Sequence, residues 1–359
     1  MERTLFDDDH ELFRRSVADW ITADVVPHYL QWETAGLAPR SLFADAGSHG
    51  FLGMAVPQSL GGGGSDDFRF NVVLAEELAA AGIGGAGLGL TLHNDITTPY
   101  FLTYCDEDQR NRWLPGIASG ELITAVAMTE PGIGSDLASM TTTAIRDGDH
   151  YVLSGSKTFI TNGINADLVI VAAKTDPTRR HRGISLMGVG AGRAGFDRGR
   201  NLDKIGLHSH DTAERIFNDV EVPVANLLGD EGAGFGYLVS NLAQERLSIA
   251  VTGVATARAA LGWTLEYAKE RQAFGQGIGS FQNSRFVLAE CHTEVEVAQA
   301  FIDRAIVALN AGSLTVEEAA MAQWWCTELP GRVVDRSGQL HGGEGQLCIL
   351  YTTSAAPAL

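Results

Sequence analysis

The spacing of apolar side chains changes twice along the chain, and this change limits the fold more than any other feature. Up to about residue 120, apolar residues recur at helical spacing, as at Phe13, Val17 and Trp20. The middle of the chain alternates apolar and polar residues, as in Ile216–Val222, which predicts strands. From about residue 233 the helical spacing returns. We therefore expect an α+β multidomain protein with an N-terminal α-helical domain (1–122), a central antiparallel β domain (123–232) and a C-terminal helical domain (233–359).

Turn and cap signals refine this division. Glycine clusters at 61–64 and 82–89 predict loops between helices. In the middle block, short apolar runs separated by turn pairs such as Ser154-Gly155 predict several strands, at Tyr151–Leu153, Lys157–Thr161, Leu168–Ala172 and Ile184–Val189. Further on, a bundle helix is expected to close at Gly312, and Thr315 with Glu318 forms a capping-box signature for the next helix.

Composition narrows the class of function. The chain has 359 residues, of which 45% are apolar, and a formal charge of −18. That charge argues against a nucleic-acid or anionic-membrane partner, although a few local arginines could still hold an anionic small molecule. The four cysteines have neither CxxC nor metal-ligand spacing, so no metal is expected. The acidic N-terminus and the lack of a membrane-length apolar run predict a cytoplasmic protein.

The segment Thr129–Asp136 reads Thr-Glu-Pro-Gly-Ile-Gly-Ser-Asp and follows the apolar run Ala125–Met128. A buried strand that breaks into proline and glycine brings bare backbone to one place, where N–H groups can approach a ligand closely. An ordinary turn is the alternative interpretation.

Glu245 is the candidate general base. It shares one helix face with Leu238, Leu242, Ile249 and Thr252, and that face is otherwise apolar. A carboxylate there loses hydration, which raises its pKa and makes it a competent base near neutral pH. The alternatives are an ion pair with Arg246 or a side chain that reaches the surface.

Three other segments carry ligand-binding chemistry. Arg271–Gly275 with Phe281-Gln282 offers a guanidinium for a phosphate and aromatic faces for a flat ring. Gln339–Gly343 places two glycines beside polar donors, and Lys157–Gly163 resembles a strand that runs into a turn. Each of these three segments could also be the ordinary end of a helix or strand.

Together these segments resemble the acyl-CoA dehydrogenase family, from about residue 5 to about 343, in the family's order and spacing. The resemblance implies that family's fold, with a C-terminal four-helix-bundle-like domain, assembled as a homotetramer (a dimer of dimers) that holds FAD. It implies that Met128, Thr129 and Ser135 contact flavin or the CoA thioester region, and that Phe159 and Thr161 lie against the isoalloxazine. By the same resemblance, Arg246 helps to place the substrate, and the FAD pyrophosphate and adenine are held, partly across a subunit boundary, by Arg271, Phe274, Gln282, Gln339 and Gly343.

The resemblance also implies an activity. The position of Glu245 is similar to that of the base in long-chain and isovaleryl-type members. The implied reaction removes the α-proton and the β-hydride of an acyl-CoA to give a trans-2-enoyl-CoA, as in fatty acid β-oxidation, with an electron-transfer flavoprotein as the acceptor. Hydrogen bonds to the thioester oxygen would stabilise the developing enolate.

After Gly343 the chain departs from the family pattern. It shows no helical period and no charged residue after Glu344, which predicts a truncated or frameshifted end and an incomplete C-terminal domain. This departure favours an alternative, a cofactor-poor or non-catalytic subunit that acts as an assembly partner. A flavin oxidase or monooxygenase on the same fold is a further alternative.

Overall fold

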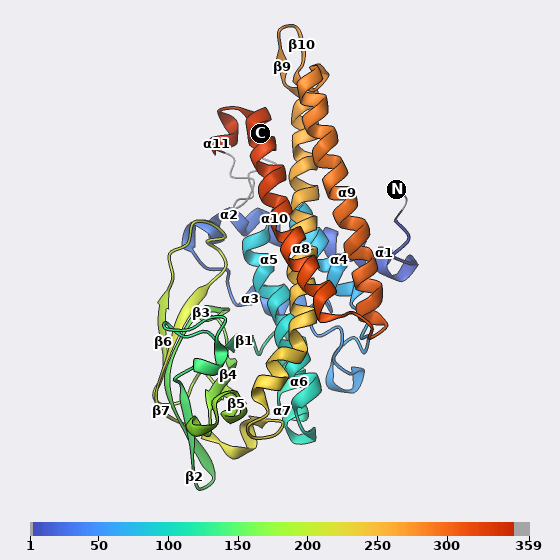
Figure 1. Cartoon of the computed structure of the whole chain (residues 1–359). Helices are drawn as coiled ribbons and strands as arrows, with labels where there is room; N and C mark the ends of the chain where they lie inside the picture. The colour runs from blue at the N-terminus through green and yellow to red at the C-terminus, as the bar shows by residue number, and fades with distance from the viewer. Residues whose placement is uncertain (1–2, 348–359) are drawn as a thin grey trace.

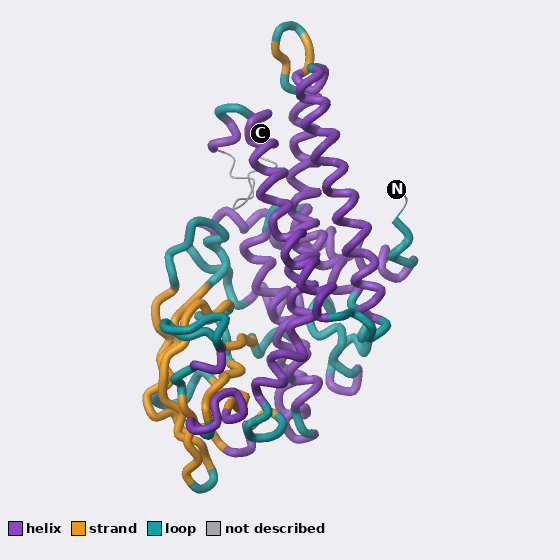
Figure 2. The backbone as a smooth tube through the Cα atoms, in the orientation of Figure 1, coloured by secondary structure: helices purple, strands orange, loops and turns teal. Residues whose placement is uncertain are grey.

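Residues 3–347 are described in the computed structural model of the chain. A group of short helices and a bundle of long helices lie against one side of a β domain (Figure 1). The longest helix, α8 (Gly234–Glu270), begins beside the β domain and extends to a hairpin at the far end of the bundle (Figures 1 and 2). This helix therefore connects the parts of the molecule that carry the predicted site residues.

The N-terminal helices follow the predicted helical spacing. Val17, Trp20 and Ile21 are buried together with residues of the neighbouring helices. Asp7 caps the first helix and Asp106 forms a capping box with Gln109 at the last. The helices are α1 (Asp8–Trp20), α2 (Val26–Ala35), α3 (Ser41–Ser48), α4 (Arg69–Ala80), α5 (Gly84–Thr91), α6 (Thr98–Tyr104) and α7 (Glu107–Ser119), with π-helical turns at Ile21–Val25 and Leu92–Thr97.

The prediction of a loop across residues 82–89 is wrong, because most of this glycine cluster forms α5. Close packing explains why glycine is used in a helix. A Cβ atom at Gly85 would overlap Ser209, and one at Gly89 would lie 2.7 Å from the side-chain oxygen of Asn162. The glycines cost helix propensity but let α5 approach the β domain closely.

The β domain is one mixed sheet in the order β6-β7-β3-β2-β4-β5-β8, with β1 paired to β4. Most pairings are antiparallel, as predicted, but β1 and β2 each pair with β4 in parallel. Alternate residues of β4 are buried on opposite faces, one toward α6 and α7 and the other toward the remaining strands. The strands are β1 (Thr124–Ala127), β2 (Thr143–Asp147), β3 (His150–Thr161), β4 (Leu168–Lys174), β5 (Ile184–Gly190), β6 (Phe196–Asn201), β7 (Thr212–Pro223) and β8 (Leu227–Leu228).

The Ser154-Gly155 pair does not separate two strands as predicted. The chain continues through it as the single strand β3, and the register against β7 shifts between Leu153 and Gly155. Gly155 has a φ of 147°, and a Cβ atom there would overlap Thr142. The glycine therefore marks a bulge rather than a turn.

In the C-terminal domain, α8 packs along α9 (Gln282–Asn310) and α10 (Val316–His341). The strands β9 (Gln272–Ala273) and β10 (Gln276–Gly277) form the hairpin between α8 and α9, and α11 (Glu344–Leu347) follows α10. The predicted capping box of Thr315 and Glu318 is confirmed at the start of α10. Gly312 follows the end of α9 with a φ of 65°. The predicted atypical end begins after Gly343: its residues 344–347 form α11, although no helical period was expected there, and the rest, from position 348 onward, lies outside the described residues.

Candidate active site

Glu245 lies on the part of α8 that faces α6. Its side chain is half-buried, and the fully buried Tyr100 of α6 donates a hydrogen bond from its hydroxyl to Glu245 Oε1 at 2.9 Å. Burial raises the pKa of Glu245, while the hydrogen bond from Tyr100 and the charge of Arg246 act in the opposite direction. The carboxylate is thus a partly desolvated proton acceptor held in place by one hydroxyl.

The alternative of an ion pair between Glu245 and Arg246 is not observed among the described residues. The two are neighbours on α8, and Arg246 influences Glu245 only through its charge. The hydrogen bond of Glu245 instead goes to Tyr100, on another helix.

A buried carboxylate, Asp95, holds α8 in place next to Glu245. Asp95, in the π-helical turn before α6, accepts a hydrogen bond from Ser248 Oγ at 2.5 Å and one from Asn71 Nδ2 at 2.5 Å. Its backbone carbonyl accepts from Gln244 Nε2 at 2.8 Å. Burial raises the pKa of Asp95 to about 6, although the hydrogen bonds from Asn71 and Ser248 lower it. These contacts hold α8 on both sides of Glu245 against the segment that leads to Tyr100.

An apolar cavity of about 320 Å³ begins one helical turn beyond Glu245. Ile249, Thr252 and Thr256 line it from α8, and Gly84 and Gly87 line it from α5. A Cβ atom at Gly87 would lie 3.1 Å from Leu78, which also lines the cavity, so the glycine lets α5 pack closely against α4 at this wall. Trp263 of α8 and Pro330 of α10 also line the cavity, so it extends along several turns of α8.

The Thr129–Asp136 segment is anchored by a buried ion pair. Lys157 Nζ lies 3.0 Å from Glu130 Oε1 and donates to the Met128 carbonyl at 2.9 Å. Glu130 also accepts hydrogen bonds from the backbone N–H groups of Thr141 and Thr142. Burial acts to raise the pKa of Glu130, but hydrogen bonds from Thr142 and Thr141 and the charge of Lys157 hold it at about 2.

The predicted flavin contacts of the β domain lie around this anchor. The Thr129 carbonyl accepts from the Thr158 N–H at 2.9 Å, which joins the segment to β3. Phe159 follows with a φ of 59° and 67% of its surface exposed. Met128, Thr129 and Thr161 are half-buried, whereas Ser135 is exposed. The contact between Thr129 and Thr158 thus places Met128 and Thr129 beside the strand that carries Phe159 and Thr161.

The other predicted cofactor residues lie at the opposite end of α8. Arg271 directly follows this helix, about 39 Å from Glu245 along its axis. Phe274, at the tip of the β9–β10 hairpin, is 97% exposed, and Gln282, Gln339 and Gly343 are also exposed. The chain therefore does not bring this group to the β-domain surface (Figure 1).

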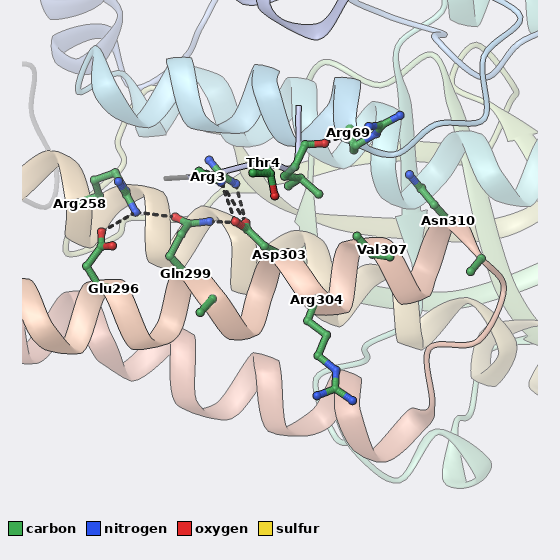
Figure 3. Close-up of a pocket in the computed structure, with 13 residues that line it drawn as sticks. Arg3, Thr4, Arg69, Arg258, Glu296, Gln299, Asp303, Arg304, Val307 and Asn310 are labelled. Carbon is green, nitrogen blue, oxygen red and sulfur yellow. Dashed lines mark hydrogen bonds and ion pairs between the residues drawn. The ribbon is translucent and has the colours of Figure 1, made fainter. Parts of the chain in front are cut away.

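Another cavity, of about 770 Å³, lies elsewhere, and residues that form internal ion pairs line it (Figure 3). Arg3 binds Asp303 and Glu76, and Arg258 donates to Gln299 on α9. These contacts fasten the N-terminal segment to the bundle, so we interpret them as structural.

Sequence reasoning missed Tyr100, Asp95 and the Glu130–Lys157 pair as contributors to the site. Tyr100 and Glu245 are 145 positions apart, so no local spacing could connect them. Within residues 3–347, no group of histidine, cysteine and carboxylate side chains has the arrangement of a metal site. No helix of that range is long and apolar enough to span a membrane.

Comparison with known proteins identifies the family. Models of the N-terminal, middle and C-terminal domains of acyl-CoA dehydrogenase match residues 7–121, 125–220 and 232–353. The mitochondrial long-chain specific acyl-CoA dehydrogenase of Sus scrofa is 41% identical over 347 residues, which cover 96% of this chain and 80% of that protein. The chain belongs to the acyl-CoA dehydrogenase family.

Other relatives of the family agree with this placement. The crystal structure of an acyl-CoA dehydrogenase from Geobacillus kaustophilus superposes with a TM-score of 0.94 at 46% identity, covering 99% of this chain and 94% of that one. The caffeyl-CoA reductase-Etf complex subunit CarC of Acetobacterium woodii is 32% identical over 343 residues, covering 95% of this chain and 90% of that protein. The predicted fold and the predicted class of oxidoreductase are confirmed. The C-terminal match continues to residue 353, further than the sequence pattern indicated.

Proposed function

We propose that this acyl-CoA dehydrogenase family member carries out the FAD-dependent α,β-dehydrogenation of an acyl-CoA thioester to a trans-2-enoyl-CoA. The observation that carries the proposal is the half-buried Glu245, which accepts a hydrogen bond from Tyr100 and lies one helical turn before the residues of α8 that line an apolar cavity. We also propose that the N-terminal helical domain ends at residue 122 and that the β domain ends at residue 232.

Glu245 accepts the α-proton. Its Oε1 is engaged by Tyr100, which leaves Oε2 to meet the substrate. Burial raises the pKa of Glu245, which makes the carboxylate a stronger base than an exposed one. The hydrogen bond from Tyr100 stabilises the charged form, so the group remains ionised before the substrate arrives. Arg246 and Ser135 are assigned to placing the thioester and the CoA arm.

The residues present fit FAD. The β-domain surface offers the hydroxyl groups of Thr129 and Thr161 for polar contacts, and the Met128 side chain and the exposed Phe159 ring for contact with a flat heterocycle. FAD, when bound there, supplies the two-electron acceptor for the β-hydride. Gly132 and Gly134 have open space around them, so backbone and ligand can approach closely.

The second group of cofactor residues is assigned to a neighbouring copy of the chain. Arg271 and Phe274 are about 39 Å or more along α8 from Glu245, which is too far to share one FAD within a chain. A second copy that brings its hairpin to the β domain would complete the site with Arg271, Phe274, Gln282, Gln339 and Gly343. Such a pair of copies is one half of the homotetramer, a dimer of dimers, that we propose for the protein.

The cavity beyond Glu245 accommodates the acyl chain. It starts at Ile249 and reaches Trp263, a distance of about 21 Å along the axis of α8. Its apolar lining and its glycines suit an unbranched chain of considerable length. The Sus scrofa relative is named as long-chain specific, and a long acyl group is the substrate we propose here.

An electron-transfer flavoprotein is the proposed electron acceptor. The Acetobacterium woodii relative is named as a subunit of an Etf complex, which supports a partner of this class. Oxygen uptake without an acceptor would favour the oxidase or monooxygenase alternative.

Anaerobic mixing of the FAD-loaded protein with acyl-CoA substrates of increasing length tests the proposal. We expect the yellow flavin to bleach, fastest with long chains, and a trans-2-enoyl-CoA to form. A colourless protein that cannot be reconstituted with FAD would contradict the proposal and favour the assembly-partner alternative.

A further inference from the structure

A row of three basic residues crosses three neighbouring strands of the β domain. Arg215 of β7 is paired with Lys157 of β3 on one side and with Arg198 of β6 on the other. Residues directly opposite each other on adjacent strands project to the same face of a sheet, so the three cationic side chains share one face. The row ends at β6, the edge strand, at the side of the β domain away from the helix bundle (Figure 1).

The positive charge of this row is only partly neutralised. Lys157 Nζ lies 3.0 Å from Glu130 Oε1. Among the residues that the structure describes, no carboxylate lies within ion-pair distance of Arg198 or Arg215, in contrast to the neighbouring Arg200. Two of the three cations therefore face each other across β6 and β7 without an anion between them.

Arg215 is the member of the row that most needs a partner. Its side chain is fully buried, and within residues 3–347 its Nε and both Nη atoms have no hydrogen-bond acceptor. Burial and the charge of Arg198 lower the pKa of Arg215 to about 10, so the guanidinium is still charged at neutral pH. A buried charge with five unpaired N–H groups is unfavourable, and a bound anion would supply both the charge and the acceptors.

A groove on the surface leads to this buried guanidinium. Phe196 and Arg198 line it from β6, and residues 190–192 line it from the end of β5. The Arg198 side chain is exposed, whereas Phe196 is buried. The guanidinium carbon of Arg215 lies 4.9 Å from the centroid of the Phe196 ring, so Arg215 lies directly behind one wall of the groove.

The acidic groups near the groove are already compensated. Asp167, which also lines it, lies 2.7 Å from Arg40 and accepts a hydrogen bond from the Ile123 N–H. Asp211 affects Arg215 through its charge alone, since its carboxylate accepts hydrogen bonds from the backbone N–H groups of residues 164 and 165. Neither carboxylate therefore occupies the donors of the two arginines.

We propose that Arg198 and Arg215 form a binding site for a phosphate ion at the edge of the β domain. Arg198 is the exposed first contact, and a rotation of the Phe196 side chain opens the path from the groove to Arg215. Guanidinium groups match the oxygen geometry of phosphate and form charge-assisted hydrogen bonds with it. The site uses neither Glu245 nor the apolar cavity, so it is independent of the proposed function. Its effect is to stabilise β6 and β7 when phosphate is present.

Hydrogen exchange of the full chain at pH 7, measured against phosphate concentration, tests this proposal. Sodium chloride at matched ionic strength is the reference condition. At a phosphate concentration ten times its Kd, the protected amides of β6 and β7 should exchange about tenfold more slowly, because opening then requires release of the ion. Phenyl phosphate in place of phosphate distinguishes the free ion from the phosphate group of a larger molecule: a response to phosphate alone assigns the site to the free ion, and an equal response supports the same chemistry on a phosphate ester.

The variants are R198Q and R215L, with R200Q as the control on the same strand. Arg200 is exposed, so R200Q removes the same charge as R198Q and should respond to phosphate like the wild type. R198Q should raise the Kd of phosphate about tenfold, the loss expected for one charge-assisted hydrogen bond. R215L should show no response to phosphate.

Three results would overturn the proposal. The first is a wild type whose exchange does not change with phosphate beyond the effect of sodium chloride. The second is a response of R198Q and R215L equal to that of the wild type. The third is an equal loss of response in R200Q, which would show a general effect of surface charge in place of a site at Arg198 and Arg215.

Discussion

The substitution Glu130→Gln should destabilise the β domain although Glu130 is not a proposed substrate contact. The change leaves the ammonium group of Lys157 buried, with the Met128 carbonyl and a neutral amide as its partners. Loss of one member of a buried ion pair typically costs 3–5 kcal/mol. The low pKa of Glu130 gives a consistent figure, because a fall from 4.5 to about 2 corresponds to about 3 kcal/mol of stability at neutral pH.

Native-state hydrogen exchange measures this loss locally, which is preferable in a protein of several domains. At pH 7, we expect the protected amides of β1 and β3 to exchange about 100-fold faster in E130Q than in the wild type. The exposed Glu121 provides the control variant E121Q, which should exchange like the wild type. The double variant E130Q/K157M should recover part of the lost stability, because it also removes the buried, unpaired charge of Lys157.

The pH dependence has a definite sign. The pKa of Glu130 is lower in the folded state than in the unfolded state, so its stabilisation is fully present above about pH 4.5 and disappears as the pH falls through 2. The difference between wild type and E130Q should therefore shrink by more than half between pH 7 and pH 3. Unchanged exchange in E130Q at pH 7, or a difference that grows in acid, would refute the reasoning.

Three further predictions concern other parts of the chain. Arg215 is fully buried, and among residues 3–347 its guanidinium nitrogens have no hydrogen-bond partner. Burial lowers the pKa of Arg215 to about 10, so Arg215→Leu should slow exchange of β6 and β7 amides; faster exchange would contradict this. Tyr100→Phe removes a hydrogen bond that lowers the pKa of Glu245, so the acid limb of the pH profile of flavin reduction should move to higher pH; a move to lower pH would argue against the contact. Thr256→Phe fills the cavity beyond Glu245 and should raise KM for long acyl-CoA substrates far more than for short ones, and an equal change for both would place the acyl chain elsewhere.

Features that depend on local sequence could be predicted well. The apolar face around Glu245 follows from helical spacing, and the start of α10 follows from the reciprocal hydrogen bonds of Thr315 and Glu318. Both depend on residues within a few positions of each other, so the sequence contains the necessary information.

Features that depend on tertiary contact could not be read in this way. Glycines 84–89 read as a loop because glycine weakens an isolated helix, and only the neighbouring Ser209 and Asn162 show why a helix needs them there. No local pattern marks Tyr100, Asp95 or Lys157 as part of a site. Only the tertiary fold places Tyr100 next to Glu245, Asp95 next to Ser248 and Lys157 next to Glu130.

The most direct test of the account is the rate of anaerobic flavin reduction by a long-chain acyl-CoA in Glu245→Gln compared with the wild type. We expect the variant to bind FAD with an unchanged absorbance spectrum, because Glu245 contacts Tyr100 and is not among the proposed FAD contacts. Flavin reduction should be slower by about 10²–10⁴-fold, the usual contribution of a general base. A variant that reduces its flavin within a few-fold of the wild-type rate would show that the base lies elsewhere.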